Sequence, residues 1–399
     1  MTSGGAWRER LTLPLLVVVQ MCQMIDFMII VPLGAQLMRV LDITPTQFGL
    51  LLTVYAGSAA VAGFVAAMFV DRYDRRRTLL LLFAGFGLTA LAAGFSPSYG
   101  ALLATRLLAG VFGGILGGTL IAIVSDVFPA ARRGRALGTL MSSFSLMLIL
   151  GLPASMTLAS SLGWRAPFLA LAAITSLALP ACALVIPPVR GHVAAGRARS
   201  MMLQIRGIFQ NANHLRVVVF QFLMVFSGFI VMCFVAPYLV ENVGVKEADL
   251  GLCYLFGGIA ALVSAQVVGR LIDVVGRHRV FAVMMVCSFI GALMATHFPR
   301  APLWAAVLLL MYLYSFFATR QIPAMAIVTA GIQPDVRGGV LSIMSSLQQL
   351  ALGTASFAAS IIVVRGPGGE LVHYGITGMV SVLVGLSALW LSRRIRQVA

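Results

Sequence analysis

The sequence predicts an all-α membrane protein with twelve transmembrane helices. Of its 399 residues, 60% are hydrophobic and only 10% are charged, and the mean hydropathy is +1.00. The apolar residues form long runs, and basic residues cluster in the short segments between them. A soluble domain of this size could not cover so much apolar surface, so lipid is the expected solvent. Lipid cannot hydrogen-bond an open backbone, so each run is expected to be a helix.

The apolar runs fall into two sets of six, and each run is close to the roughly 20 residues that cross a bilayer. The expected spans are 11–38, 46–70, 78–95, 99–127, 135–160, 165–186, 214–240, 248–271, 279–297, 302–330, 338–364 and 373–392. The only long polar interval contains Pro187-Pro188 and several arginines. The predicted organisation is a first six-helix bundle (1–186), a cytoplasmic linker (187–213) and a second six-helix bundle (214–399).

The placement of basic residues predicts the orientation of the chain. With alternating spans, 21 of the 28 basic residues lie on the side of the N-terminus and five lie on the opposite side. This asymmetry predicts that both termini are cytoplasmic. The formal charge of +16 therefore reflects membrane topology, and no stretch of mixed aromatic and basic residues predicts nucleic-acid binding.

The two halves carry matching loop segments, which indicates an internal duplication. Asp71 and Arg75, after the second span, align with Asp273 and Arg277, after the eighth, at an offset of 202 residues. The segments 129–134 and 334–338 also correspond, and a Met-Ser-Ser triplet follows each of them. Three matches at nearly one offset favour two related six-helix units.

These loops resemble the G-x-L-x-D-x-x-G-R signature of the major facilitator superfamily. Arg106-Leu-Leu-Ala-Gly110 resembles its fourth-helix R-x-x-x-G element, and Asp26…Pro32 resembles the first-helix element of its drug/proton antiporter branch. Gly151-Leu-Pro153 with Gly163-Trp164-Arg165 is similar to the fifth-helix region of arabinose-efflux-like members. The first loop departs from the signature at Ala67 and Asp74, and the fifth-helix motif is degenerate.

The resemblance implies two pseudo-symmetric bundles that expose a central site to each side of the membrane in turn. It further implies a monomer in a bacterial inner membrane that exports a small molecule in exchange for protons. No cofactor is expected, because the proton gradient would supply the energy. A proton-coupled symporter or facilitator for a sugar or organic anion would use the same fold and is the alternative.

Asp26 and Arg106 are the predicted proton-coupling residues. Asp26 is the only carboxylate well inside a span, about 15 residues, or roughly 22 Å, from its start. An embedded charge costs at least about 2.5 kcal/mol, so it should face a cavity or a partner. Arg106 lies at comparable depth in the fourth span. We expect Asp26 to bind the proton and Arg106 to modulate it; a static ion pair between two helices is the alternative.

Five residues are predicted to contact the substrate. Gln23 and Met24 lie beside Asp26, although Gln23 could instead join helices by hydrogen bonds. Arg320, deep in the tenth span, could bind a carboxylate or phosphate of the substrate, or equally well backbone carbonyls. Gln221 and Tyr238 are the polar candidates on the seventh span.

A third group of residues is predicted to latch the cytoplasmic side. By the resemblance, a loop carboxylate sits against a helix N-terminus and the following arginine pairs with an acid that ends the fourth helix. The expected members are Asp71, Arg72, Arg75, Asp126, Gly269, Asp273 and Arg277. Each ion-pair or helix-dipole term is of order 1 kcal/mol. Ordinary loop charge that sets the topology is the alternative.

Other classes of protein fit the sequence poorly. The five histidines are scattered, the five cysteines lie at irregular spacing within apolar runs, and no nucleophile, metal or nucleotide-binding motif appears. An enzyme, a metal site and an ATP-driven pump are therefore not expected. A transporter-like sensor would need a soluble signalling domain, and none is predicted.

Overall fold

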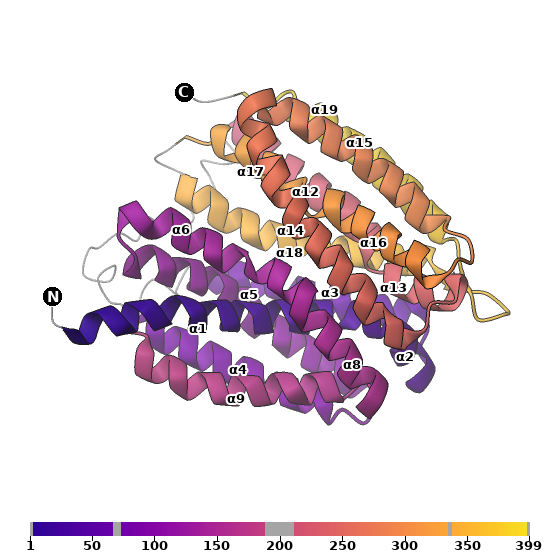
Figure 1. The fold of residues 1–399 in the computed structure, drawn as a ribbon, viewed down its shortest axis with the longest axis horizontal. Coiled ribbons are helices and arrows are strands. Elements are labelled where there is room, and N and C mark those ends of the chain that lie inside the picture. The colour runs from indigo at the N-terminus through magenta and orange to yellow at the C-terminus, as the bar shows by residue number, and fades with distance from the viewer. Residues whose placement is uncertain (1–2, 67–72, 188–210, 334–336, 397–399) are drawn as a thin grey trace.

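The computed structural model describes residues 3–66, 73–187, 211–333 and 337–396. Figure 1 shows two helical bundles, one from the first half of the chain (indigo to magenta) and one from the second half (pink to yellow). Both chain termini lie at the same end of the molecule (Figure 1), which we call the terminal end; the opposite end is the distal end. The predicted linker 187–213 falls mostly outside the described residues.

The first bundle contains six membrane-crossing units. They are α1 (Ser3–Met28) with α2 (Ile30–Val40); α3 (Pro45–Ala66); α4 (Arg75–Gly94); α5 (Tyr99–Val127); α6 (Ala130–Met141), α7 (Ser143–Leu146), the π-helix η2 (Met147–Gly151) and α8 (Leu152–Leu162) as one broken helix; and α9 (Ala166–Val185).

The second bundle repeats this order. It contains α12 (Ala212–Met232), α13 (Val235–Tyr238) and the π-helix η3 (Leu239–Val243); η4 (Glu247–Asp249) and α14 (Leu250–Val275); α15 (Arg277–Thr296); α16 (Leu303–Phe317) and α17 (Gln321–Ala330); α18 (Arg337–Ile362); and α19 (Tyr374–Ser392). A short antiparallel hairpin of β1 (Val364–Arg365) and β2 (Leu371–Val372) precedes α19.

The helical units confirm the predicted twelve-helix fold. Eleven helices in the described ranges are long and apolar enough to cross a bilayer. The remaining unit, α18, has 26 residues and occupies the place of the predicted eleventh span. It borders a gap in the described ranges.

Prolines account for the interruptions within four of these units. Pro32, Pro237 and Pro323 follow the breaks at Ile29, Cys233–Phe234 and Ala318–Arg320, and Pro153 follows the π-helical turn. A proline has no N–H for the carbonyl four residues earlier, and its ring crowds that carbonyl. The breaks at Ile29 and Phe234 lie in the first unit of each bundle, and each is three residues before a proline, Pro32 or Pro237.

Small residues let helices pack closely within and between the bundles. A Cβ added at Gly110 or Gly114 of α5 would overlap backbone atoms of α3. Between the bundles, α3 packs along α18, where Ser356 Oγ donates to Gly49 O at 3.0 Å. Close backbone approach at small residues is the usual way in which membrane helices gain packing energy.

The two bundles are joined by polar contacts at the distal end. Arg39 Nη1 lies 3.2 Å from Glu241 Oε1, and its Nη2 pairs with Glu247. Thr46 Oγ1 donates to Ser360 O at 2.9 Å. Two further hydrogen bonds of this distal half join α3 to α18, from Thr53 Oγ1 to Gly353 O and from Ser356 Oγ to Gly49 O. The structure is therefore closed at the distal end.

Candidate functional site

Asp26 and Arg106 form a fully buried ion pair inside the first bundle. Arg106 Nη1, from α5, lies 3.0 Å from Asp26 Oδ1 on α1 and donates to the Asp26 backbone carbonyl at 3.2 Å. Both side chains are 0% exposed. Asp26 is the only acidic residue among the described ones that is buried to this degree. An ion pair in such a setting is costly to form and very costly to break on one side only.

Aromatic side chains surround the guanidinium of Arg106. Its Cζ lies 5.0 Å from the ring centroid of Phe168 on α9 and 6.0 Å from that of Tyr55 on α3. The ring faces favour a cation, and they replace water around it. Arg106 Nη2 and Asp26 Oδ2 have no hydrogen-bond partner within the described ranges. The pair is therefore enclosed by α1, α3, α5 and α9.

Phe27 connects this pair to the second bundle. Its ring lies 5.2 Å from that of Tyr55 and stacks at 5.6 Å on Phe229 of α12. This contact is not predicted from either residue alone, but Phe27 and Phe229 are 202 residues apart, which is the offset of the loop repeat. The residue next to the buried acid thus touches its own counterpart in the other bundle.

Gln23 is tied to the backbone of α5. Its Nε2 donates to Gly113 O at 2.6 Å, and Gln20 Nε2 donates to Gln23 Oε1 at 3.2 Å. Both glutamines are buried. Met24, half-buried, packs against the main apolar core. In this conformation Gln23 joins α1 to α5 by a hydrogen bond, as expected if its role is to hold helices together and not to contact substrate.

Arg320 is a buried cation held by neutral acceptors. It lies at the break between α16 and α17 and is 2% exposed. Its Nη1 donates to Ser288 Oγ at 2.9 Å, and its Nη2 donates to Met224 O at 3.0 Å and Ser227 Oγ at 3.3 Å. The Phe317 ring lies 4.7 Å away. None of the ion pairs between described residues includes Arg320.

The other two residues predicted to contact substrate lie at different depths of the seventh unit. Gln221 is fully buried and its Nε2 lies 3.5 Å from Gln321 Oε1 on α17. The Tyr238 hydroxyl donates to Phe298 O at 3.1 Å, and its ring packs on Tyr374 at 4.7 Å. These two side chains are therefore not brought together, and neither is among the hydrogen-bond partners of Arg320 in the described part of the chain.

The predicted latch residues are placed in part. Arg75 Nη1 lies 2.8 Å from Asp126 Oδ2 and donates to Ala122 O at 2.8 Å. In the second bundle Arg277 Nη1 donates to Ala326 O at 3.2 Å, while Gly269 is half-buried and Asp273 is exposed on α14. Each arginine therefore caps a carbonyl near the end of the fourth helix of its own bundle. Asp71 and Arg72 lie outside the described residues.

The distal ion pairs were not expected from the sequence. Arg39, Glu241 and Glu247 lie just outside the expected spans 11–38, 214–240 and 248–271, and the sequence predicts no role for them. The pairing depends on η3 and η4, which bring the two glutamates toward the end of α2. Nothing in the local sequence of Arg39 identifies partners 202 and 208 residues away.

Comparison with known proteins identifies the class to which this fold belongs. The sequence model of the Major Facilitator Superfamily matches the chain twice, over residues 16–216 and 217–398. The chain belongs to this superfamily and is a membrane transporter.

Two relatives and two solved structures illustrate the similarity. A probable sugar efflux transporter of Helicobacter pylori (strain G27) is 23% identical over 90% of this chain and 89% of its own length. A chloramphenicol efflux pump of Mycobacterium tuberculosis (strain H37Rv) is 25% identical over 61% of this chain and 59% of its own length. A D-xylose–proton symporter has a TM-score of 0.75 at 17% identity, covering 94% of this chain and 96% of that one. An inward-facing, unoccupied bacterial homologue of the lysosomal transporter Spinster has a TM-score of 0.74 at 15% identity, covering 97% and 98%. The two structures establish the shared fold.

Proposed function

We propose that this transporter exports a small molecule in exchange for protons, and that Asp26 is its proton-binding residue. The observation that carries the proposal is the fully buried pair of Asp26 and Arg106 on two helices of the first bundle. A carboxylate embedded at this depth is retained against a cost of about 2.5–3.5 kcal/mol, and such residues usually serve proton or ion transfer. The two relatives named for efflux support the direction of transport.

Protonation of Asp26 would act through its contact with Arg106. A neutral carboxyl group attracts the guanidinium less, so the link between α1 and α5 weakens. The break at Ile29 lies one turn beyond Asp26, and Phe27 touches Phe229 of the other bundle. A small movement of α1 therefore reaches the contact between the bundles. Because both charged groups are buried, exchange of the proton requires such a movement.

The conformational cycle would exchange contacts at the two ends of the bundles. We take the terminal end as cytoplasmic, in a bacterial inner membrane, as the distribution of arginines predicts. The distal pairs of Arg39 with Glu241 and Glu247 must then separate when the transporter opens outward. The latch around Arg75 and Asp126, with Asp71, Arg72, Gly269, Asp273 and Arg277, would hold the cytoplasmic side closed in that state.

The substrate is proposed to bind between the bundles near Gln23, Met24, Gln221, Tyr238 and Arg320. In the present conformation the polar members of this set have partners within the protein, so binding would exchange those bonds for bonds to the solute. We expect no cofactor, and we expect a monomer to be sufficient.

The test is transport in proteoliposomes with an imposed pH gradient and a pH-sensitive dye inside. Cationic dyes, chloramphenicol, sugars and organic anions would be added one class at a time. We expect one class to dissipate the gradient in the wild type, with solute and protons moving in opposite directions. Asp26→Asn should abolish this coupling. Asp42→Asn is the matched control, since Asp42 is an exposed acid at the distal end whose φ of 49° asparagine readily adopts.

The result that would refute the proposal is uphill transport by the folded Asp26→Asn variant at the wild-type level. Thermal unfolding of each variant would verify folding, and Asp26→Glu should keep part of the coupling because it can still bind a proton. Movement of protons and solute in the same direction would instead support symport.

Arg320 supports a second candidate, an organic anion as the substrate. Its guanidinium is buried and has no acidic partner among the described residues, so a carboxylate or phosphate on the solute would balance its charge. If so, organic anions should be the active class in the same assay, and Arg320→Gln should raise the substrate concentration needed for half-maximal rate. Activity confined to neutral or cationic solutes would exclude this candidate.

A further inference from the structure

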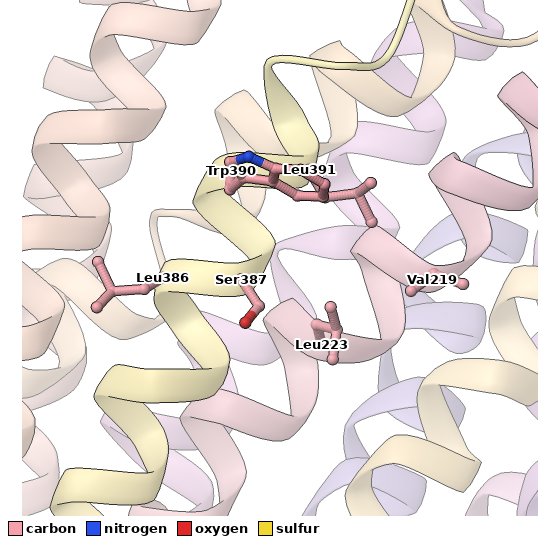
Figure 2. Close-up of a pocket in the computed structure, with 6 residues that line it drawn as sticks. All are labelled: Val219, Leu223, Leu386, Ser387, Trp390 and Leu391. Carbon is pink, nitrogen blue, oxygen red and sulfur yellow. The ribbon is translucent and has the colours of Figure 1, made fainter.

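A groove runs along the outside of the second bundle between α12 and α19, which lie side by side (Figure 2). It has a volume of about 470 Å³. Its wall is apolar apart from one serine, and consists of Val219, Leu223, Leu386, Ser387, Trp390 and Leu391. Trp390 and Leu386 are 56% and 48% exposed. On a membrane-spanning surface, side chains exposed to this degree face lipid.

The periodicity of the two helices directs this groove toward a basic cluster. On α12, Arg216 precedes Val219 by three residues and Leu223 by seven, so all three share one face. On α19, Ser387 and Trp390 are three residues apart and share one face, and Arg394, in the turn after the helix, lies over the Trp390 ring. Both series therefore lead from the apolar groove to arginines at the terminal end of the bundle.

The arginines of this cluster are connected to each other and to the groove. Arg216 Nη1 donates to the Arg394 carbonyl at 3.4 Å, and Arg394 Cζ lies 4.2 Å from the Trp390 ring. Arg393 and Arg396 are exposed beside them. No ion pair between described residues neutralises any of these four side chains. Positive charge thus accumulates where the membrane-spanning helix α12 begins and α19 ends.

A second groove serves as an internal comparison. It lies between α4 and α9 in the first bundle, has a volume of about 460 Å³, and is lined by apolar residues such as Leu88 and Leu179 together with Thr175 and Ser176. Arg165 stacks on Trp164 and donates to Ser96 O, and Arg76 of α4 donates to Ala183 O of α9. The two grooves are therefore similar in size, and filling the second one is a matched control for filling the first.

We propose that the groove between α12 and α19 is a binding site for an anionic phospholipid of the surrounding bilayer. One acyl chain lies along Val219, Leu223 and Leu386, Trp390 packs at the boundary between chain and headgroup, and the phosphate binds Arg216 and Arg394. Basic pockets between membrane helices recognise anionic headgroups in this way, and tryptophan is favoured at the interface. The site is independent of the proposed proton coupling and of the direction of transport.

Native mass spectrometry of the purified full chain with added phosphatidylglycerol tests this site. Phosphatidylcholine with the same acyl chains is the reference lipid. We expect phosphatidylglycerol to bind at least about tenfold more tightly than phosphatidylcholine, and Arg216→Gln with Arg394→Gln to remove most of that preference. Ser387→Trp should fill the groove and weaken binding without removing any charge.

Matched variants separate a specific site from general attraction to a basic protein. Arg270→Gln with Arg279→Gln removes two exposed arginines at the same end, and Ser176→Trp fills the groove of the first bundle; both should bind phosphatidylglycerol as the wild type does. The proposal is overturned if the Arg216 and Arg394 double variant binds as tightly as wild type, if the two control variants lose as much affinity, or if inorganic phosphate alone competes at equal concentration.

Discussion

The two bundles repeat the same helices but carry different charges at corresponding positions. In the first bundle Asp26 of α1 pairs with Arg106. In the second, the residue 202 positions after Asp26 is Gly228, and a Cβ there would overlap Nη2 of Arg320. Both arginines extend from the fourth helix of their bundle to the first, although 214 residues separate them. The first bundle therefore holds a neutral pair, whereas Arg320 in the second bundle pairs with no acid among the described residues.

The same asymmetry occurs at the terminal end. Arg75 and Arg277, 202 residues apart, each donate to a carbonyl of the fourth helix, at Ala122 and Ala326. One turn further on, the first bundle has Asp126 and the second has Ala330. The backbone framework is therefore duplicated, whereas Asp26 and Asp126 have no acidic counterpart at these two positions of the second bundle.

The largest expected effect is that of Arg106→Met. It leaves the Asp26 carboxylate buried without a cation, which costs about 3–5 kcal/mol in the free energy of unfolding. Thermal or denaturant unfolding in detergent measures this loss. Asp26→Leu combined with Arg106→Met should recover most of the stability, since no buried charge then remains. A double variant as unstable as the single one would show that the pair itself does not cause the loss.

Arg320→Met should have a smaller effect, about 1–2 kcal/mol, because only neutral hydroxyl and carbonyl acceptors lose their donor. The same unfolding measurement applies to both arginine variants. An equal loss for Arg320→Met and Arg106→Met would contradict the difference between the bundles.

Gly228→Asp introduces the missing acid beside Arg320. The overlapping atom is the end of a flexible side chain, so the guanidinium can shift and pair with the new carboxylate. We expect a change in unfolding free energy within about 1 kcal/mol, whereas Gly228→Leu should cost about 1–3 kcal/mol by overpacking without a new ion pair. If aspartate proves as costly as leucine, no acid can be accommodated at this position.

Asp126→Asn should have the smallest effect on stability, below about 1 kcal/mol, because this acid is partly exposed and its pair with Arg75 is screened. Its effect should instead be conformational, with greater labelling of engineered cysteines at the terminal end. Ser125→Ala, one residue away, is the control. Unchanged labelling in Asp126→Asn would argue against a latch at this position.

Several features of this protein could be derived from the sequence because they depend on local composition. The length and polarity of each run predicted the helices, and the matching loops predicted the two related bundles. Prolines follow four of the interruptions, yet Pro14 and Pro180 lie within the continuous helices α1 and α9, so the positions of prolines do not by themselves predict the breaks. The sequence likewise predicted which helix carries Asp26, Arg106 and Arg320 and roughly how deep each residue lies in it.

What those residues contact was decided by the tertiary structure. From the sequence, Asp26 could face either a cavity or a charged partner. The packing of α1 against α5 places Arg106 beside it. For Arg320 the sequence allowed two partners, a substrate anion or backbone carbonyls. In the folded protein its guanidinium donates to the Ser288 and Ser227 hydroxyls and to the Met224 carbonyl. The ion pairs of Arg39 with Glu241 and Glu247 could not be predicted from the sequence, because they join positions 202 and 208 residues apart. Helix formation depends on neighbours along the chain, whereas the partner of a buried charge depends on which faces of different helices meet.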